Sequence, residues 1–259
     1  MSKKTALITG ASAGLGAHFA RLFVADGHDV VIVARRRDKL EELASELKQT
    51  HAGATVHVIA EDLGKTGAAA RLSAALSARD IDIEFLVNNA GFGGVGAFAQ
   101  RDLAREVEML QVNVVTLVEL THLLLPAMIS RKSGRVLNLG STAGFLPGPF
   151  MAVYYASKAF VNSFTEALAV ELEGTGVTAT VSCPGATATE FSQVAGNDKS
   201  ALFKTNVMGA GDVARDAYRA LMRGDATTIP GFMNKVRIAS LRMAPRRAAR
   251  KIAASMNRT

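Results

Sequence analysis

The sequence of 259 residues is poor in several residue types, and each scarcity excludes a class of protein. It contains one cysteine, Cys183, so no internal disulfide can form, and a cytoplasmic location is expected. Only 20% of the residues are charged and six are proline, whereas 49% are hydrophobic, which excludes an intrinsically disordered chain. We therefore expect a globular protein with a substantial core.

Uninterrupted apolar runs are also scarce. Residues 136–157 carry no charge, but they include three glycines and two prolines, which do not suit a membrane-spanning helix. We expect no membrane span, and no set of side chains predicts a metal site.

Acidic residues are missing from the C-terminal part of the chain. From residue 226 to the end there are eight lysines and arginines and no aspartate or glutamate, whereas the first 225 residues carry 22 basic and 23 acidic groups. The formal net charge of +7 therefore belongs to the tail.

Short apolar runs alternate with helical patterns along the chain. The runs are rich in Val, Ile and Leu, which is typical of strands covered on both faces of a parallel sheet. The expected strands span residues 5–9, 29–33, 56–60, 84–88, 135–139, 178–183 and 227–229. The expected helices span residues 14–26, 38–49, 66–78, 102–128, 153–173 and 212–223. This order predicts a single α/β domain, a Rossmann-type doubly wound parallel sheet of about seven strands that binds its ligand at the carboxyl ends of the strands.

A glycine-rich turn joins the first expected strand to the first expected helix. Glycine lets the backbone approach a ligand closely, and a helix N-terminus offers free N–H groups and a partial positive charge to a phosphate. A plain structural turn is the alternative. We interpret the turn as a pyrophosphate site formed by Gly10, Ser12, Ala13, Gly14, Leu15 and Gly16.

Together with Thr9, this turn reads Thr-Gly-x-x-x-Gly-x-Gly and resembles the classical short-chain dehydrogenase/reductase family, over roughly residues 4–191. The resemblance implies that residues after the third, fourth and sixth strands contact the adenine, the ribose and the nicotinamide with its phosphates, respectively. The matching positions here are Asp62 and Leu63, then Asn89, Ala90 and Gly91, then Pro184, Gly185, Thr187 and Thr189.

Two arginines follow the second expected strand, where NAD-binding sheets carry an acidic residue. Arg35 and Arg36 offer planar donor forks that suit the 2′-phosphate of NADP(H) and stacking on adenine. A solvated basic loop is the alternative. The sequence thus predicts NADP(H) as the cofactor.

Four residues match the catalytic positions of the family: Asn113, Ser141, Tyr154 and Lys158. Tyr154 and Lys158 are four residues apart and share one helix face, and Ser141 precedes Tyr154 by 13 residues. A tyrosine has an ordinary pKa of about 10, and a neighbouring ammonium favours its phenolate form. The resemblance implies that Tyr154 is the acid/base, Ser141 holds the substrate oxygen, Lys158 also binds the nicotinamide ribose, and Asn113 helps hold a water for proton relay.

Apolar side chains after the strands that carry these residues predict a hydrophobic, bulky or lipid-like carbonyl substrate. The expected lining residues are Phe92, Phe145, Phe150 and Phe191.

The tail predicts a C-terminal extension of this single domain. Residues 1–231 form the cofactor-binding and catalytic domain, and residues 232–259 form a basic amphipathic extension, helical over 234–256 and interrupted at Pro245. Phe232, Val236, Ala239 and Met243 form one helical stripe. A lid or oligomer contact, a membrane-surface helix and a solvated basic end remain open, and nucleic acid is not an expected partner.

Three functional hypotheses follow. The first is a working NADPH-dependent reductase or dehydrogenase, expected as a homodimer or homotetramer because the family is commonly oligomeric through the helices at 102–128 and 153–173. The second is a catalytically silent NADP(H)-binding regulator on the same fold. The third, compatible with the first, is a membrane-peripheral reductase of lipid carbonyls.

Overall fold

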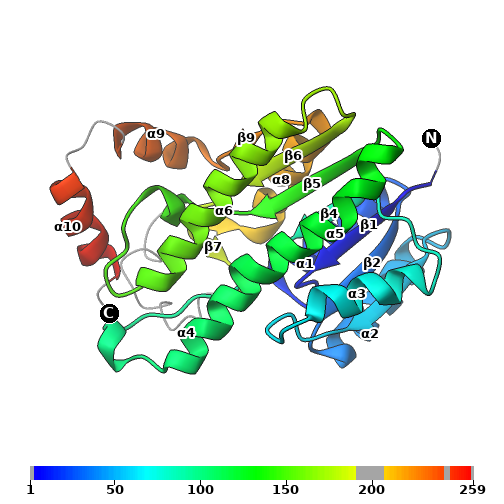
Figure 1. The fold of residues 1–259 in the computed structure, drawn as a ribbon, viewed down its shortest axis with the longest axis horizontal. Helices are drawn as coiled ribbons and strands as arrows, with labels where there is room; N and C mark the ends of the chain where they lie inside the picture. Colours follow the sequence, from blue (N-terminus) through cyan, green and yellow to red (C-terminus); the bar gives the residue numbers. More distant parts are fainter. Residues whose placement is uncertain (1–2, 191–206, 242–245, 258–259) are drawn as a thin grey trace.

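The structure is a computed structural model, and it describes residues 3–190, 207–241 and 246–257. Seven parallel strands form its central sheet (Figure 1). They are β1 (Thr5–Thr9), β2 (Asp29–Ala34), β3 (Val56–Ala60), β4 (Phe85–Asn88), β5 (Gly134–Leu139), β6 (Val177–Ser182) and β9 (Thr227–Thr228). Their order is β3-β2-β1-β4-β5-β6-β9, so the direction of winding reverses between β1 and β4. The predicted doubly wound sheet of about seven strands is confirmed.

Helices cover both faces of the sheet (Figure 1). One core contains side chains of α1 (Gly14–Ala25), α2 (Arg37–Thr50) and α8 (Ala210–Arg223). The opposite core contains side chains of α3 (Ala68–Ser77), α5 (Thr116–Ser130) and the loops beside them, together with α6 (Ala152–Glu171).

Strand β1 shows why both cores form. Successive side chains of a strand point to opposite faces. Ala6 and Ile8 accordingly belong to the core beneath α1, whereas Leu7 belongs to the core beneath α3 and α5. All three are fully buried, as expected for a strand without a solvated face.

The helix predicted at 102–128 is interrupted. It begins as α4 (Leu103–Leu110), passes through one π-helical turn, η2 (Gln111–Val115), and continues as α5. A π-turn inserts one residue into the hydrogen-bonding pattern and is frequent at functional sites. Asn113 lies in this turn.

The run Leu103–Ser130 is long and apolar enough to cross a membrane, with a mean hydropathy of 1.7 in a window that is 33% buried. Length and composition alone do not distinguish a span from a helix that covers a core. Leu120 and Met128 are fully buried in the core shared with α3, so this run forms a layer of the fold. The uncharged stretch at 136–157 is divided among β5, the short helix η3 (Thr142–Phe145) and α6.

The C-terminal part forms two helices, α9 (Phe232–Leu241) and α10 (Arg246–Asn257). They lie together at one end of the molecule, drawn in orange and red in Figure 1. The predicted interruption at Pro245 lies outside the described residues. A small parallel pair that was not predicted, β7 (Thr187–Ala188) with β8 (Met208–Gly209), lies between β6 and α8 in the chain.

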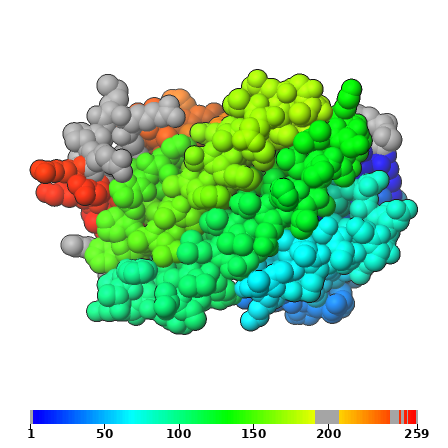
Figure 2. Space-filling view, viewed as in Figure 1, coloured from blue at the N-terminus to red at the C-terminus, as the bar shows by residue number. Residues whose placement is uncertain are grey.

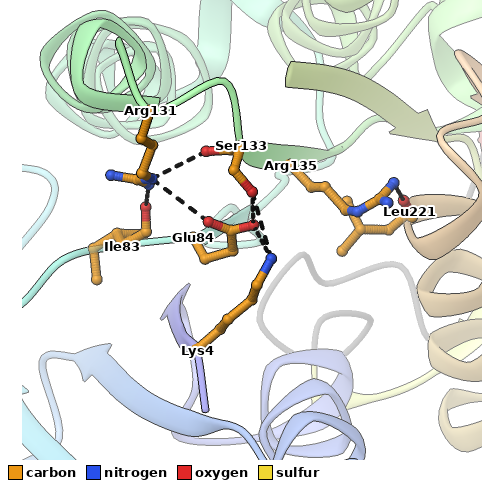
Figure 3. Close-up of polar contacts among 7 residues, drawn as sticks. All are labelled: Lys4, Ile83, Glu84, Arg131, Ser133, Arg135 and Leu221. Carbon is orange, nitrogen blue, oxygen red and sulfur yellow. Dashed lines mark hydrogen bonds and ion pairs between the residues drawn. The ribbon is translucent and has the colours of Figure 1, made fainter. Parts of the chain in front are cut away.

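A polar network ties the amino ends of the strands together (Figure 3). Glu84, just before β4, accepts hydrogen bonds from Lys4 Nζ (2.5 Å) and Ser133 Oγ (2.6 Å), and Arg131 Nε lies 3.5 Å from it. Burial raises the pKa of Glu84, but the hydrogen bonds from Lys4 and Ser133 and the charges of Lys4 and Arg131 together hold it below its ordinary value. This network stabilises the edge of the sheet opposite the carboxyl ends.

Candidate active site

A cavity of about 880 Å³ opens at the carboxyl ends of the strands. This volume is within the range of about 300–1,000 Å³ that is typical of small-molecule and cofactor sites. Loops after β1, β2, β3, β4, β5 and β6 all contribute to its walls. The sheet therefore brings together segments that are far apart in the sequence, at the position expected for a doubly wound fold.

The glycine turn packs directly against the loop after β4. A Cβ at Gly10, which has φ +67°, would lie 2.9 Å from Ala90 Cα, and a Cβ at Gly16 would lie 2.3 Å from the Gly10 carbonyl oxygen. Asn89 Nδ2 donates to the carbonyl of Thr9 at 2.8 Å and holds the turn in place. Larger side chains at either glycine would separate the two loops.

Helix α1 begins at the cavity without a side-chain cap. Ala13 is its N-cap residue, and no acidic residue lies in its first turn. Its first N–H groups are therefore available to an anion, which is how dinucleotide-binding folds hold a pyrophosphate. A Cβ at Gly14 would meet the side chain of Thr189 at 3.2 Å, so the loop after β6 closes over the same turn.

Arg35 and Arg36 also line the cavity, and their side chains are about half exposed. Arg36 Nη2 donates to Ser12 Oγ (3.1 Å) and to Glu190 (2.9 Å). Arg35 Nη1 lies 3.4 Å from Glu108 Oε1. Both residues follow β2, and the guanidinium group of Arg36 stands beside the glycine turn while that of Arg35 stands beside Glu108.

The remaining cofactor positions predicted from the sequence also line this cavity, with Gly16 behind the turn as the one exception. Asp62 accepts a hydrogen bond from the Gly64 N–H at 3.0 Å, which orients its carboxylate after β3. The other lining positions are Leu63, Asn89, Ala90, Gly91, Pro184, Gly185, Thr187 and Thr189.

Tyr154, Lys158 and Ser141 lie together beside the loop after β6. Tyr154 and Lys158 come from the first two turns of α6 and line the cavity. Lys158 Nζ donates to the Leu139 carbonyl at 2.6 Å and lies 6.0 Å from the centre of the Tyr154 ring. Ser141, at the start of η3, is hydrogen-bonded to Tyr154. Its hydroxyl also accepts from the Ala143 N–H at 3.0 Å.

Burial controls the titration of this cluster in the protein alone. It raises the pKa of Tyr154 well above its ordinary value, and the hydrogen bond with Ser141 opposes that shift. Burial also lowers the pKa of Lys158 to about 8. Both groups therefore favour their neutral forms more than they would in water. The downward shift that the sequence predicts for Tyr154 is not present in the protein alone.

Asn113 does not line the cavity, but it is hydrogen-bonded to two segments that form its walls. Its Oδ1 accepts from the Phe92 N–H (3.1 Å), and its Nδ2 donates to the Phe92 carbonyl (3.0 Å) and to Ser157 Oγ (3.1 Å). Ser157 Oγ in turn donates to the Tyr154 carbonyl at 2.7 Å. Asn113 is thus a buried polar residue in an apolar helix because, from the π-turn, its side chain connects the loop after β4 to the start of α6.

Asn162 has a similar role that the sequence analysis missed. Its Nδ2 donates to the Ser141 carbonyl (3.1 Å), and its Oδ1 accepts from the Ser141 N–H (3.4 Å). The signal was available, because residues 154, 158 and 162 are spaced by four and share one face of α6.

The predicted substrate residues are separated in space. Phe92 lines the cavity, whereas Phe145 packs against a small core with Val161 and Val181. Phe150 borders a separate hollow of about 20 Å³, and Phe191 lies outside the described residues.

The C-terminal helices form part of the cavity wall. The sequence had left the role of this tail open among three alternatives. Asn234, Arg237, Ile238 and Ser240 of α9 and Met256 of α10 line it. At the end of α10, Asn257 accepts from Tyr155 Oη (3.1 Å) and donates to the Pro149 carbonyl (3.0 Å). These contacts hold α10 against the loop between η3 and α6.

Comparison with known proteins agrees with this arrangement. Residues 4–200 match the family model of short chain dehydrogenases. The chain is 38% identical over 239 residues to sulfoacetaldehyde reductase 2 of Chromohalobacter salexigens, covering 90% of this chain and 91% of that protein. It is 37% identical over 190 residues to the NADP-dependent 3-hydroxy acid dehydrogenase YdfG of Escherichia coli, covering 73% and 75% of the two chains. Among solved structures, a short-chain dehydrogenase from Sphingobium yanoikuyae in complex with NADPH superposes with a TM-score of 0.84 at 32% identity, covering 93% of this chain and 92% of that chain.

Proposed function

The chain belongs to the short-chain dehydrogenase family, and on that premise we propose which of its residues carry the reaction. It is an NADP(H)-dependent oxidoreductase that interconverts a carbonyl group and an alcohol. The observation that carries the proposal is one cavity lined by both arginines, Tyr154 and Lys158, with Ser141 hydrogen-bonded to Tyr154.

We propose that the glycine turn and the N-terminus of α1 hold the pyrophosphate, and that Arg35 and Arg36 hold the 2′-phosphate. The uncapped helix N-terminus and the two half-exposed guanidinium groups support this assignment. When bound, the nicotinamide supplies or accepts a hydride. Glu190 and Glu108 neighbour the arginines. When the 2′-phosphate binds, each glutamate would move aside or stay on the edge of the guanidinium fork that faces away from the phosphate.

In the reducing direction, Tyr154 would donate its hydroxyl proton to the substrate oxygen as the carbonyl carbon receives the hydride. Ser141 would hold that oxygen by a hydrogen bond, and solvent would return the proton to Tyr154. The ammonium of Lys158 favours the phenolate that is left behind, and it could contact the nicotinamide ribose. Asn113 would position Phe92 and the start of α6 through its hydrogen bonds. Its part in a water relay for the proton, which the family resemblance implies, stays a proposal.

Substitution of Tyr154 by phenylalanine tests this assignment. General acid/base groups contribute typically about 10²–10⁴-fold, so Tyr154→Phe should lower kcat by that factor while NADPH still binds. Tyr218→Phe is a matched control, because Tyr218 is bonded to Asp26 on the far side of α1. A wild-type protein that binds NADPH but reduces no carbonyl in a broad panel would instead support the silent regulator.

We further propose a substrate with an apolar portion. Phe92, Leu146, Met151, Ile238 and Met256 line the cavity and support this expectation. Turnover of long-chain 3-oxo compounds and aromatic ketones would agree with it, and exclusive turnover of small polar carbonyls would contradict it.

We retain the division into a catalytic unit at 1–231 and a basic extension at 232–259 as a proposal, with the extension acting as a wall of the substrate cavity. The contacts of Asn257 with Tyr155 and Pro149 support this role. A chain that ends at 231 should still bind NADPH but should lose affinity for the carbonyl substrate.

A homodimer or homotetramer is proposed through α5 and α6. Leu123, Ile129, Phe160 and Val170 are exposed apolar side chains on these helices, which spread over the face shown in Figure 2. Side chains of this kind on one face favour association. Light scattering of the wild type and of Phe160→Glu with Val170→Glu measures the oligomer directly.

A peripheral membrane contact is a second proposal, together with a cytoplasmic location. Arg247, Arg250 and Lys251 of α10 are exposed, and so are Phe232 and Met233 of α9. Basic and apolar side chains together favour an anionic bilayer surface. Co-sedimentation with anionic and neutral liposomes, for full-length and tail-truncated protein, tests the contact.

A further inference from the structure

The charges that line the cavity are unevenly distributed. The carboxylates lie beside the proposed cofactor residues: Glu108 neighbours Arg35, Glu190 is paired with Arg36, and Glu61 and Asp62 follow β3. Lys158 is bonded to the Leu139 carbonyl. In the part of the wall that α9 contributes, the charged side chain is Arg237.

Arg237 is placed in the cavity wall by the packing of α9. Asn234 and Ile238, three residues before and one after it, are buried. Asn234 lies against the loop after β6, because a Cβ at Gly185 would meet Asn234 Oδ1 at 2.7 Å. Helix α9 also contacts η3, which begins directly after Ser141. Helix α9 therefore forms the cavity wall on the side of η3 and the loop after β6, and Arg237 lines that wall.

The surroundings of Arg237 provide it with no counter-charge within the described ranges 3–190, 207–241 and 246–257. Its side chain is exposed, and no carboxylate of those ranges lies within ion-pair distance of its guanidinium group. The same cavity is also lined by the apolar side chains Leu146, Met151 and Met256. A planar guanidinium fork in such a wall matches the two oxygens of a carboxylate.

We propose that Arg237 binds a carboxylate of the substrate, so that the enzyme acts on oxo acids and hydroxy acids with an apolar segment. This inference rests on the proposed function and adds to it a substrate class and a specificity-determining residue. The apolar walls would contact the carbon chain, and the carbonyl would lie at Tyr154 and Ser141.

Matched substrates test the inference. A series of linear oxo acids and their methyl esters keeps the chain and the ketone constant while it removes the charge. A hydrogen-bonded charge contributes roughly 10- to 100-fold, so wild-type kcat/KM should favour each acid over its ester by about that factor. Arg237→Met should remove the preference, mainly through the KM for the acid, and should leave the ester and the KM for NADPH unchanged.

Two control variants separate charge from helix stability. Arg237→Lys keeps the charge but not the planar fork, and it should retain part of the preference. Lys235→Met removes an exposed charge from the same helix outside the cavity wall, and it should behave as the wild type. Calorimetric binding of a hydroxy acid to the NADP⁺-saturated protein gives a second readout that does not depend on turnover.

Equal kcat/KM for acids and esters in the wild type would overturn the inference, as would an Arg237→Met variant that keeps the preference. A rise only in the KM for NADPH would assign Arg237 to the cofactor and overturn it as well. The proposed function fails in a different way: no carbonyl of either kind is reduced. In that case the calorimetric titration still decides whether Arg237 binds the acid.

Discussion

Asn162 offers a test of how α6 positions the reacting groups. Replacement by leucine, which is similar in size, removes the acceptor of the Ser141 N–H and one of the two donors to the Ser141 carbonyl. The carbonyl keeps its hydrogen bond from the Gly144 N–H at 3.0 Å. The N–H keeps only the neighbouring Cys183 sulfur, a weak acceptor, so the cost approaches that of an unsatisfied buried donor, about 1–3 kcal/mol.

Crowding adds to this cost. A Cβ at Gly140 would lie 2.1 Å from Asn162 Oδ1, so the branched end of a leucine has no free space there. Overpacking of this kind typically costs about 1–3 kcal/mol, which brings the expected loss of unfolding free energy to about 2–6 kcal/mol. The displaced Ser141 hydroxyl should lower kcat by about 10- to 100-fold, because misplacement of a reacting group by about 1 Å has effects of this size.

Urea unfolding and steady-state kinetics measure the two effects separately. Asn138→Leu is the matched control, since Asn138 is buried on β5, is bonded to Asn88 and Thr165 (2.9 Å each), and does not line the cavity. It should lose stability and keep kcat. The reasoning is refuted if Asn162→Leu keeps the wild-type kcat, or if Asn138→Leu loses as much activity.

Three further predictions follow from individual groups. Burial lowers the pKa of Lys158 to about 8 in the free protein, so kcat/KM for reduction should fall as pH rises through about 8 and the ammonium is lost; a profile that stays level to pH 10 would argue against a role for its charge. Asn257→Ala should raise the KM for the carbonyl substrate by about tenfold with unchanged NADPH affinity, because one or two hydrogen bonds hold α10 to the cavity; equal KM values would show that α10 does not shape the site. Glu84→Ala should lower the unfolding free energy by about 1–3 kcal/mol and leave both KM values unchanged. The folded-state pKa of Glu84 lies below its ordinary value of 4.5. The wild type should therefore be more stable than Glu84→Ala above pH 4.5 and should lose this difference in stability as pH falls through the folded-state pKa. Thermal unfolding at several pH values measures the difference.

Much of the catalytic end could be predicted from the sequence, because its geometry is local. The spacing of Tyr154 and Lys158 fixes one face of a helix, and a residue directly after a strand, such as Ser141, must lie at the carboxyl edge of a parallel sheet. The glycine turn was recognisable because it joins a strand to a helix, and its packing against Ala90 explains why side chains are excluded there.

The remaining features depend on contacts between distant segments. The π-turn around Asn113 was not predicted, because a helical hydrophobic pattern does not reveal one inserted residue. The position of Arg237 follows from the packing of α9 against η3, more than 80 residues away in the chain. Phe145 and Phe150 follow the expected strand, but their side chains face a core and a separate hollow, which the distance from a strand end does not determine.

The central claim is that Arg35 and Arg36 select NADP(H) for a reaction at Tyr154. Fluorescence titration of NADPH and NADH, on the wild type and on Arg35→Ala with Arg36→Ala, tests it most directly. The account predicts strong preference for NADPH in the wild type and a loss of at least roughly 100-fold in NADPH affinity in the double variant, with NADH little changed. Tight NADH binding that is the same in both proteins would contradict it and would show that the two arginines are surface charges.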